Sequence, residues 1–291
     1  MTTIRLDWPQ YRGGDPDGVM EFLPGLTRPE GRIAYGIGGQ VAAMLAPDAL
    51  EAVRIPVDPD GGDGSVVDGI VDKPEILRQQ RLVLDTLRER DADRVVTIGG
   101  DCSVSVAPFA HLLERHGEDL AILWLDSHPD CNQPGADGNQ GYNTMAAAHL
   151  LGHGDPEILD QLGIHVAAER FALVGTHSWA DQDPTAALEE WKLNQISPAE
   201  ETPFVIAVLD WLAATGCSKV AIHFDLDVIT SGEVAFGMAP EAGGISLDTA
   251  VATAAAVAER CELVGLTISE FVSSEAVRLH SLLRRLPLLN P

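Results

Sequence analysis

Carboxylates and one histidine recur at alternate positions in two short segments of this chain. Asp126, His128 and Asp130 are spaced two residues apart, as are Asp225 and Asp227. Side chains two apart in an extended chain project from the same face, so each segment directs several ligand atoms to one point. Carboxylates gathered at one point repel one another unless cations lie between them. A single pair of this kind is also typical of a solvated loop, but two such segments, each following a buried strand, indicate a metal site.

Oxygen-rich ligation with one imidazole suits Mn²⁺ or a similar divalent ion, and the ligands are numerous enough for two ions that share carboxylates. The elements that must position them are short apolar runs alternating with helix-length stretches. The sequence predicts strands at 94–100, 121–125, 171–175, 220–224 and 262–268, and helices at 75–90 and 247–260. Near-continuous apolar strands separated by helices indicate a parallel sheet covered on both faces, with ligands at the carboxyl ends of the strands. Because no repeat or Pro/Ser-rich linker divides the chain, we expect one α/β domain over residues 1–291.

Composition excludes several classes of function. The 291 residues include 19 Lys and Arg against 44 Asp and Glu, so the formal charge is −25, which disfavours binding to nucleic acid or to a membrane surface. The 45% hydrophobic content is that of a globular chain, and no segment approaches the ~20 apolar residues of a membrane span. The N-terminus lacks the pattern of a signal peptide, and four cysteines are too few for a disulfide scaffold. We therefore expect a cytoplasmic, soluble protein.

A glycine-rich segment, Gly36-Ile-Gly-Gly-Gln-Val41, partly resembles a dinucleotide-binding loop. Such a loop requires a strand immediately before it, whereas residues 27–32 are predicted to form a turn. We therefore predict that this segment is a glycine-rich turn that caps a helix, and that it binds no NAD or FAD.

The motifs together resemble those of the ureohydrolases, the family of arginase and agmatinase, which hydrolyse guanidino or formimino groups at a binuclear manganese centre. The family pattern is G-G-D-H-S, then D-A-H-x-D, then S-x-D-x-D, each after a strand, with a glutamate near the last strand. The corresponding segments, over about residues 90–275, are Gly99-Gly-Asp-Cys-Ser103, Asp126-Ser-His-Pro-Asp130, His223-Phe-Asp225-Leu-Asp227 and Ser269-Glu270-Phe271. The resemblance implies a three-layer α/β/α arginase-like fold with a mostly parallel central sheet, and a homo-oligomer, either a trimer or a hexamer.

The resemblance also implies roles for single residues. Asp126 and Asp225 would bridge two divalent metal ions. The other implied ligands are Cys102 and Asp130 for the first ion, and His128 and Asp227 for the second. Glu270 would bind the guanidinium, because a carboxylate can accept two of its N–H bonds, and Asp130 is a candidate to carry a proton to the leaving amine.

Cys102 departs from the family, which has a metal-ligating histidine at this position. A thiolate prefers softer ions than Mn²⁺, so Ni²⁺, Co²⁺ or Zn²⁺ are alternatives to it, and a small buried residue is the alternative to a ligand. A subset of arginase-like enzymes that act on Nω-hydroxy-arginine also has Cys here, and the segment Cys-Ser-Val-Ser resembles them.

The substrate side of the site matches the family least. Asn132 matches the arginase asparagine that helps to hold an amino-acid carboxylate, and Asn139 is a candidate for the same role, with loop capping as the alternative for both. Asn143 stands where arginases have a histidine, and asparagine cannot transfer protons. His149, on a predicted helix, is expected to be a packed or capping residue. His177, at another strand end, is a candidate to face the site.

These inferences predict a metal-dependent amidinohydrolase that cleaves the guanidino C–N bond of arginine or an arginine derivative through a metal-bridging hydroxide, and releases urea or hydroxyurea. A hydrolase of the agmatinase or formiminoglutamase type is one alternative. A catalytically weak relative that keeps the fold as a binding or structural protein is another, favoured by Cys102 and Asn143.

Overall fold

A computed structural model describes residues 1–135, 139–179, 183, 185–198, 203–237, 239–272 and 275–290 of the protein. Its main sheet has eight parallel strands in the order β2-β1-β5-β10-β9-β6-β7-β8. The strands are β1 (Thr3–Trp8), β2 (Ala52–Arg54), β5 (Arg94–Gly99), β6 (Leu120–Leu125), β7 (Phe171–Val174), β8 (Asn194–Ile196), β9 (Lys219–Asp225) and β10 (Glu262–Ser269). The two-residue strands β3 (Val66–Val67) and β4 (Ile70–Val71) form a separate antiparallel pair. The five predicted strands are confirmed, whereas β1, β2 and β8 were not predicted.

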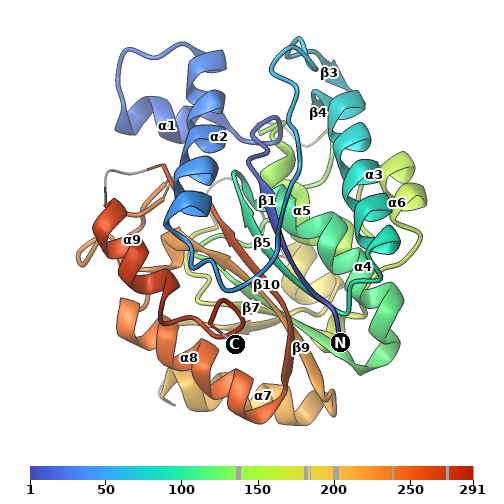
Figure 1. Ribbon diagram of the computed structural model, residues 1–291, viewed down its shortest axis with the longest axis vertical. Helices are drawn as coiled ribbons and strands as arrows, with labels where there is room; N and C mark the ends of the chain where they lie inside the picture. The colour runs from blue at the N-terminus through green and yellow to red at the C-terminus, as the bar shows by residue number, and fades with distance from the viewer. Residues whose placement is uncertain are drawn as a thin grey trace.

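Helices cover both faces of this sheet (Figure 1). They are α1 (Pro16–Phe22), α2 (Arg28–Leu45), α3 (Lys73–Glu89), α4 (Val106–His116), α5 (Ala146–Leu150), α6 (Pro156–Leu162), α7 (Phe204–Thr215), α8 (Leu247–Arg260) and α9 (Ala276–Leu283). One apolar core lies between the sheet and α3, α4, α5 and α6, and the other between the sheet and α2, α7, α8 and α9. The expected three-layer α/β/α fold is therefore confirmed, as are the helices predicted at 75–90 and 247–260. Among the described residues, no helix is long and apolar enough to cross a membrane.

The central strand β6 shows why the strands next to the site were predictable. Its six residues, Leu-Ala-Ile-Leu-Trp-Leu, are all buried. Ile122 and Trp124 enter one core, and Leu123 and Leu125 enter the other. A strand buried on both faces must be apolar at every position, which makes it conspicuous in a sequence.

The glycine-rich segment was predicted wrongly. Residues 28–45 form one continuous helix, α2, so 27–32 is a helix start rather than a turn and the glycines lie inside the helix. The side chain of Glu30 accepts a hydrogen bond from the backbone N–H of Thr27 at 2.8 Å, which stabilises this start. A Cβ on Gly38 would lie 1.3 Å from the carbonyl oxygen of Phe271, and one on Gly39 would lie 2.5 Å from that of Gly99. The glycines therefore allow α2 to approach the backbone at the ends of β5 and β10.

Candidate metal centre and substrate pocket

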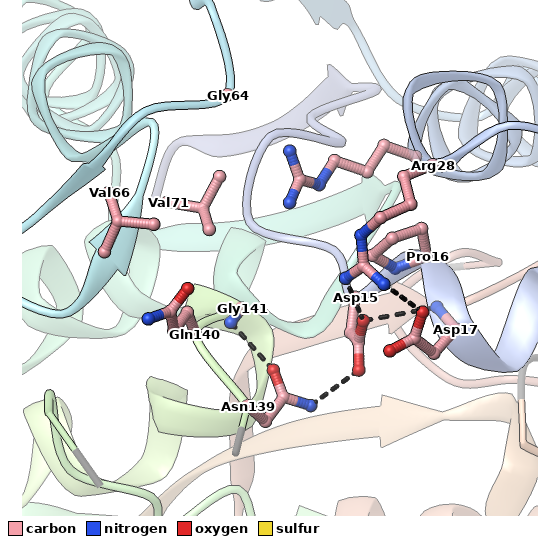
Figure 2. A pocket seen from close by; sticks show the side chains of 11 residues that line it. Asp15, Pro16, Asp17, Arg28, Gly64, Val66, Val71, Asn139, Gln140 and Gly141 are labelled. Carbon is pink, nitrogen blue, oxygen red and sulfur yellow. Dashed lines mark hydrogen bonds and ion pairs between the residues drawn. The ribbon is translucent and has the colours of Figure 1, made fainter. Parts of the chain in front are cut away.

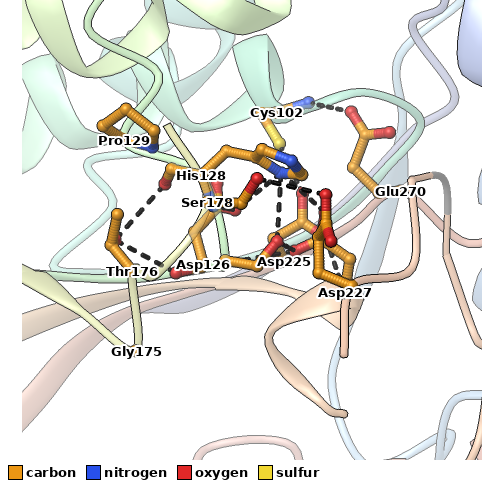
Figure 3. A network of polar contacts seen from close by, with 12 residues as sticks. Cys102, Asp126, His128, Pro129, Gly175, Thr176, Ser178, Asp225, Asp227 and Glu270 are labelled. Atoms are coloured by element: carbon orange, nitrogen blue, oxygen red, sulfur yellow. Dashed lines mark hydrogen bonds and ion pairs between the residues drawn. The ribbon is translucent and has the colours of Figure 1, made fainter. Parts of the chain in front are cut away.

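Four neighbouring strands, β5, β10, β9 and β6, end at one place on the sheet edge. The short helical turn after β5 begins at Cys102, the segment after β6 carries Asp126, His128 and Asp130, β9 ends at Asp225 with Asp227 in the next turn, and Glu270 directly follows β10. The side chains that Figure 3 labels among these, from Cys102, Asp126, His128, Asp225, Asp227 and Glu270, lie close together. The sheet order therefore brings together the residues that the sequence analysis selected from four separate segments.

Three overlapping groups of ligand atoms lie here, each with all of its atoms within 4.8 Å of one another. The groups are Cys102, Asp126, Asp130 and His223; Cys102, Asp225 and Glu270; and Asp126, His128 and Asp227. All of these residues are buried except His128, which is partly exposed. Asp126 and Cys102 each belong to two groups, so the arrangement has room for more than one ion with shared ligands.

Local hydrogen bonds hold the carboxylates in place. Asp126 accepts from the backbone N–H of His128 at 2.7 Å, and Asp225 accepts from that of Asp227 at 2.8 Å. Asp227 accepts from the backbone N–H and the hydroxyl of Ser127 at 3.1 and 2.8 Å, and its other oxygen lies 2.9 Å from Nδ1 of His128. In each segment a backbone N–H thus holds the carboxylate two residues before it. The contacts of Asp227 with Ser127 and His128 join the segment after β9 to the segment after β6.

The carboxylates at this place lie without a paired lysine or arginine in the part of the chain that the structure describes. Burial, followed by the neighbouring carboxylates, raises the pKa of Asp126 and of Asp225 well above the usual range. Among the described residues, Asp126 and Asp227 form ion pairs only with histidines, and none of the three carboxylates pairs with a lysine or arginine. Oδ2 of Asp130 and Nε2 of His223 are buried, and neither has a hydrogen-bond partner among the residues that the structure describes. Buried oxygen and nitrogen atoms that lack a hydrogen-bond partner, among clustered carboxylates, are suited to bind divalent metal ions.

Cys102 and Glu270 are connected to each other and to the carboxylates. Sγ of Cys102 lies 2.9 Å from Oδ2 of Asp225, and its backbone N–H donates to Glu270 at 3.0 Å. Glu270 has a φ of +66°, and its own N–H donates to the carbonyl of Gly100 at 2.7 Å. This left-handed backbone conformation, rare for a residue with a side chain, turns Glu270 back towards the strand ends. Burial, followed by the charge of Asp225, raises the pKa of Glu270 well above its ordinary value.

The three asparagines predicted to contact the substrate lie in the segment between β6 and α5. The side chain of Asn132 donates to Thr144 at 3.2 Å, and that of Asn139 donates to Asp15 at 2.7 Å and accepts from the N–H of Gly141. Asn143 is buried, and its Oδ1 has no hydrogen-bond partner among the described residues. Asn132 and Asn139 thus have loop-stabilising bonds, while Asn143 has a free acceptor atom.

The two histidines with open roles behave differently. His149 is fully buried and bonded to the backbone of Met145 and Asp155, so the prediction of a packed or capping histidine is confirmed. Nδ1 of His177 lies 2.8 Å from the carbonyl oxygen of Gly175. The backbone N–H of His177 donates to the carbonyl oxygen of Ser127, next to Asp126. His177 belongs to none of the three ligand groups, although it lies at the end of β7 beside them.

A separate pocket of about 430 Å³ lies beside the same loop (Figure 2). It is lined by Asp15, Arg28, Arg32, Asn139 and Gly141, among others, and by none of the candidate metal ligands. Arg28 lies 3.7 Å from Asp15, and Nε of Arg32 is buried without a partner. The sequence analysis selected Asn139 but missed the charged residues, because no motif surrounds them.

The loops connect this pocket to the strand ends. The backbone N–H of Asn143 donates to the carbonyl of Gly13 at 3.0 Å. A Cβ on Gly13 would lie 2.9 Å from the hydroxyl of Ser103, which follows Cys102. The segment of residues 13–15 therefore lies beside the turn at Cys102 at one end and lines the pocket at the other.

The fold and the converging strand ends are those of a known class of proteins. The model of the arginase family matches residues 46–276, and the chain belongs to this family. It is similar to an arginase of Bacillus subtilis (strain 168), with 24% identity over 157 residues, which span 52% of this chain and 52% of that protein. An arginase of Coccidioides immitis (strain RS) is 23% identical over 62% of this chain and 60% of its own length. The chain thus matches only a little over half the length of these curated relatives.

Solved structures show the same fold at lower identity. Arginase from Bacillus caldovelox superposes with a TM-score of 0.79 at 15% identity, covering 98% of this chain and 96% of that one. Proclavaminate amidino hydrolase from Streptomyces clavuligerus superposes with a TM-score of 0.68 at 17% identity, covering 98% and 88%. The arginase-like fold predicted from the motifs is therefore confirmed.

Proposed function

We propose that this protein is a metal-dependent amidinohydrolase that cleaves the guanidino C–N bond of arginine or of an arginine derivative such as Nω-hydroxy-arginine. The observation that carries the proposal is the convergence of buried carboxylates, a thiol and an imidazole on one point, without a lysine or arginine paired to the carboxylates in the described chain. Membership of the arginase family supports the same reaction.

The chain's own residues would hold two ions. Asp126 and Asp225 would bind both, and the remaining ligands would be Cys102 and Asp130 on one side and His128 and Asp227 on the other. Divalent ions in such a site lower the pKa of bound water and so supply a hydroxide nucleophile at neutral pH. Mn²⁺ is the first choice for the oxygen ligands, and Co²⁺, Ni²⁺ or Zn²⁺ for the thiolate.

Glu270 would orient the substrate. Its carboxylate lies at the end of β10 beside Cys102, and a guanidinium can donate two parallel N–H bonds to it. Asp130, whose Oδ2 is buried without a partner, would carry a proton to the leaving amine. Neither role depends on Asn143, which cannot transfer a proton.

The pocket beside the loop supports an amino-acid substrate. Arg28 and Arg32 offer cations for an α-carboxylate, Asp15 offers an anion for an α-ammonium group, and Asn139 lines the same wall. Agmatine has a guanidinium but no carboxylate, so it would use only part of this pocket. We therefore place arginine and Nω-hydroxy-arginine before agmatine and formimino compounds, with Asn132 and His177 as further contacts.

The test is release of urea or hydroxyurea from arginine, Nω-hydroxy-arginine and agmatine, with Mn²⁺, Co²⁺, Ni²⁺ or Zn²⁺ added separately. Asp126→Ala should abolish turnover and lower the number of bound ions by more than one, while the protein stays folded. Asp248→Asn, which alters an exposed carboxylate on α8, is the matched control and should behave as the parent. Near-normal metal content in Asp126→Ala would contradict a shared ligand.

The second candidate, a binding or structural protein with the same fold, is favoured by the departures at Cys102 and Asn143. It predicts bound metal and bound guanidino ligand without turnover in every arm of the same panel. We further propose a single domain, a homo-oligomeric state and a cytoplasmic location, which gel filtration with light scattering and fractionation of cells would test.

A further inference from the structure

His223 is a buried histidine that the proposed mechanism does not use. It lies two residues before Asp225 on β9, and its side chain has no exposed surface. Its Nε2 has no hydrogen-bond partner among the described residues and lies 3.8 Å from Oδ2 of Asp126. The same nitrogen or its ring partner lies within 4.8 Å of ligand atoms of Cys102 and Asp130.

The ring is held in one orientation by its surroundings. It stacks on the indole of Trp124, with the ring centres 3.6 Å apart and the planes at 13°. On the other side, Nδ1 lies 2.7 Å from the hydroxyl of Ser105. When Nδ1 carries the proton and donates to Ser105, Nε2 keeps a lone pair that can bind an ion. Metal-binding histidines are commonly oriented by such a bond to the nitrogen that does not bind the ion.

We propose that His223 is a nitrogen ligand of the ion held by Cys102, Asp126, Asp130 and Asp225; this inference depends on the metal centre proposed above. Two neighbouring ligand atoms on one ion, with bonds of about 2.0–2.3 Å, lie roughly 2.8–3.3 Å apart with five or six ligands and roughly 3.3–3.8 Å apart with four. The 3.8 Å between Nε2 and Asp126 therefore needs a movement of at most about 1 Å. The ion would have one sulfur, one nitrogen and carboxylate oxygens as ligands.

This placement explains the departure at Cys102 chemically. The family motifs have histidine at position 102 and serine at position 223, whereas this chain has Cys102 and His223. The imidazole thus comes from the strand β9 instead of the turn after β5, and the site keeps a nitrogen donor. A thiolate together with an imidazole suits Zn²⁺ or Co²⁺ better than Mn²⁺. We therefore expect this site to prefer a different divalent ion from the site formed by oxygen ligands and His128.

The test uses Co²⁺ and the full-length protein, and it does not depend on activity. The Co²⁺-loaded parent should show a near-ultraviolet sulfur-to-cobalt band from Cys102. Its proton NMR spectrum should show two strongly shifted imidazole N–H resonances, one from the partly exposed His128 and a slowly exchanging one from the buried His223. His223→Asn should lose this resonance and bind one Co²⁺ at least about tenfold more weakly. Ser105→Ala, which keeps the imidazole but removes its partner, should weaken binding in the same direction.

The matched control is His111→Asn. His111, on α4, is also buried, but it bonds to the carbonyl of Ala92 and belongs to none of the three ligand groups. This variant should leave both resonances and the Co²⁺ affinity unchanged. A Co²⁺-loaded parent with only one shifted resonance that persists in His223→Asn, or an unchanged affinity in His223→Asn, would overturn the role of His223 and leave the proposed function standing. A parent that binds no divalent ion would overturn both. Because His128 is also a proposed ligand, the number of shifted resonances in the parent, two or one, decides the point even where a variant does not fold.

Discussion

The buried histidine of α5 makes the stability of this fold depend on pH. Nδ1 of His149 lies 2.9 Å from the carbonyl of Met145, and Nε2 accepts the backbone N–H of Asp155 at 2.9 Å. Both bonds form only when the ring is neutral with its proton on Nδ1, because a protonated Nε2 would face another donor. Burial accordingly lowers the pKa of His149 from 6.5 to about 4.

Unfolding removes this constraint, so between these two pKa values His149 is protonated in the unfolded chain but neutral in the folded one. The stability that His149 provides is complete above about pH 6.5 and is lost as the pH falls towards 4. With these two pKa values, the contribution of His149 to the free energy of unfolding should fall by about 2 kcal/mol between pH 7.5 and pH 5. Gln does not titrate, so His149→Gln removes this part of the pH dependence, whatever it does to the stability at neutral pH.

Urea unfolding of the metal-free protein at pH 7.5 and pH 5, with a chelator present, measures the effect. The parent should lose about 2 kcal/mol more than His149→Gln over this interval. His280→Gln, which removes an exposed histidine from α9, is the control and should lose as much as the parent. Equal losses in the parent and in His149→Gln would refute the reasoning, because the buried neutral ring would then not link stability to pH.

Two further predictions concern the site and its support. Glu270→Gln should retain the metal and lower kcat/KM for a guanidino substrate at least about tenfold, since a charge-assisted pair contributes roughly 1.5–3 kcal/mol; unchanged kcat/KM with bound metal would place the guanidinium elsewhere. Gly38→Ala should lower the melting temperature and the activity, because its Cβ would lie 1.3 Å from the carbonyl oxygen of Phe271, next to Glu270. Gly232→Ala is its control, since the nearest atom there is 4.0 Å away, and equal stability of the two variants would show that α2 moves freely.

Part of the site could be recognised because its determinants are local. The alternating carboxylates at 126–130 and 225–227 share a face through chain geometry alone, and the apolar run at 120–125 is buried on both faces. Each signal lies within a few neighbouring residues, so the sequence predicted the strands, the parallel sheet and the candidate ligands.

The features that were missed depend on contacts between distant segments. The glycines of α2 disfavour a helix by propensity, and only the close approach to the backbone at Phe271 and Gly99 explains their presence in one. Strand β1 places Ile4, Leu6 and Trp8 in one core, whereas the alternate residues Arg5 and Asp7 form an ion pair, so it lacked a continuous apolar pattern. A local pattern cannot report such packing.

His223 shows the same limit at the site itself. Its position in the sequence is only that of a residue in a buried strand, two before Asp225. The register of β9 beside β6 sets it opposite Trp124 and so next to Asp126, and Ser105 from a third segment orients the ring. The sequence by itself determined which carboxylates gather at the strand ends. The tertiary structure decided which other donors they meet, because that depends on how strands far apart in the chain are ordered and aligned.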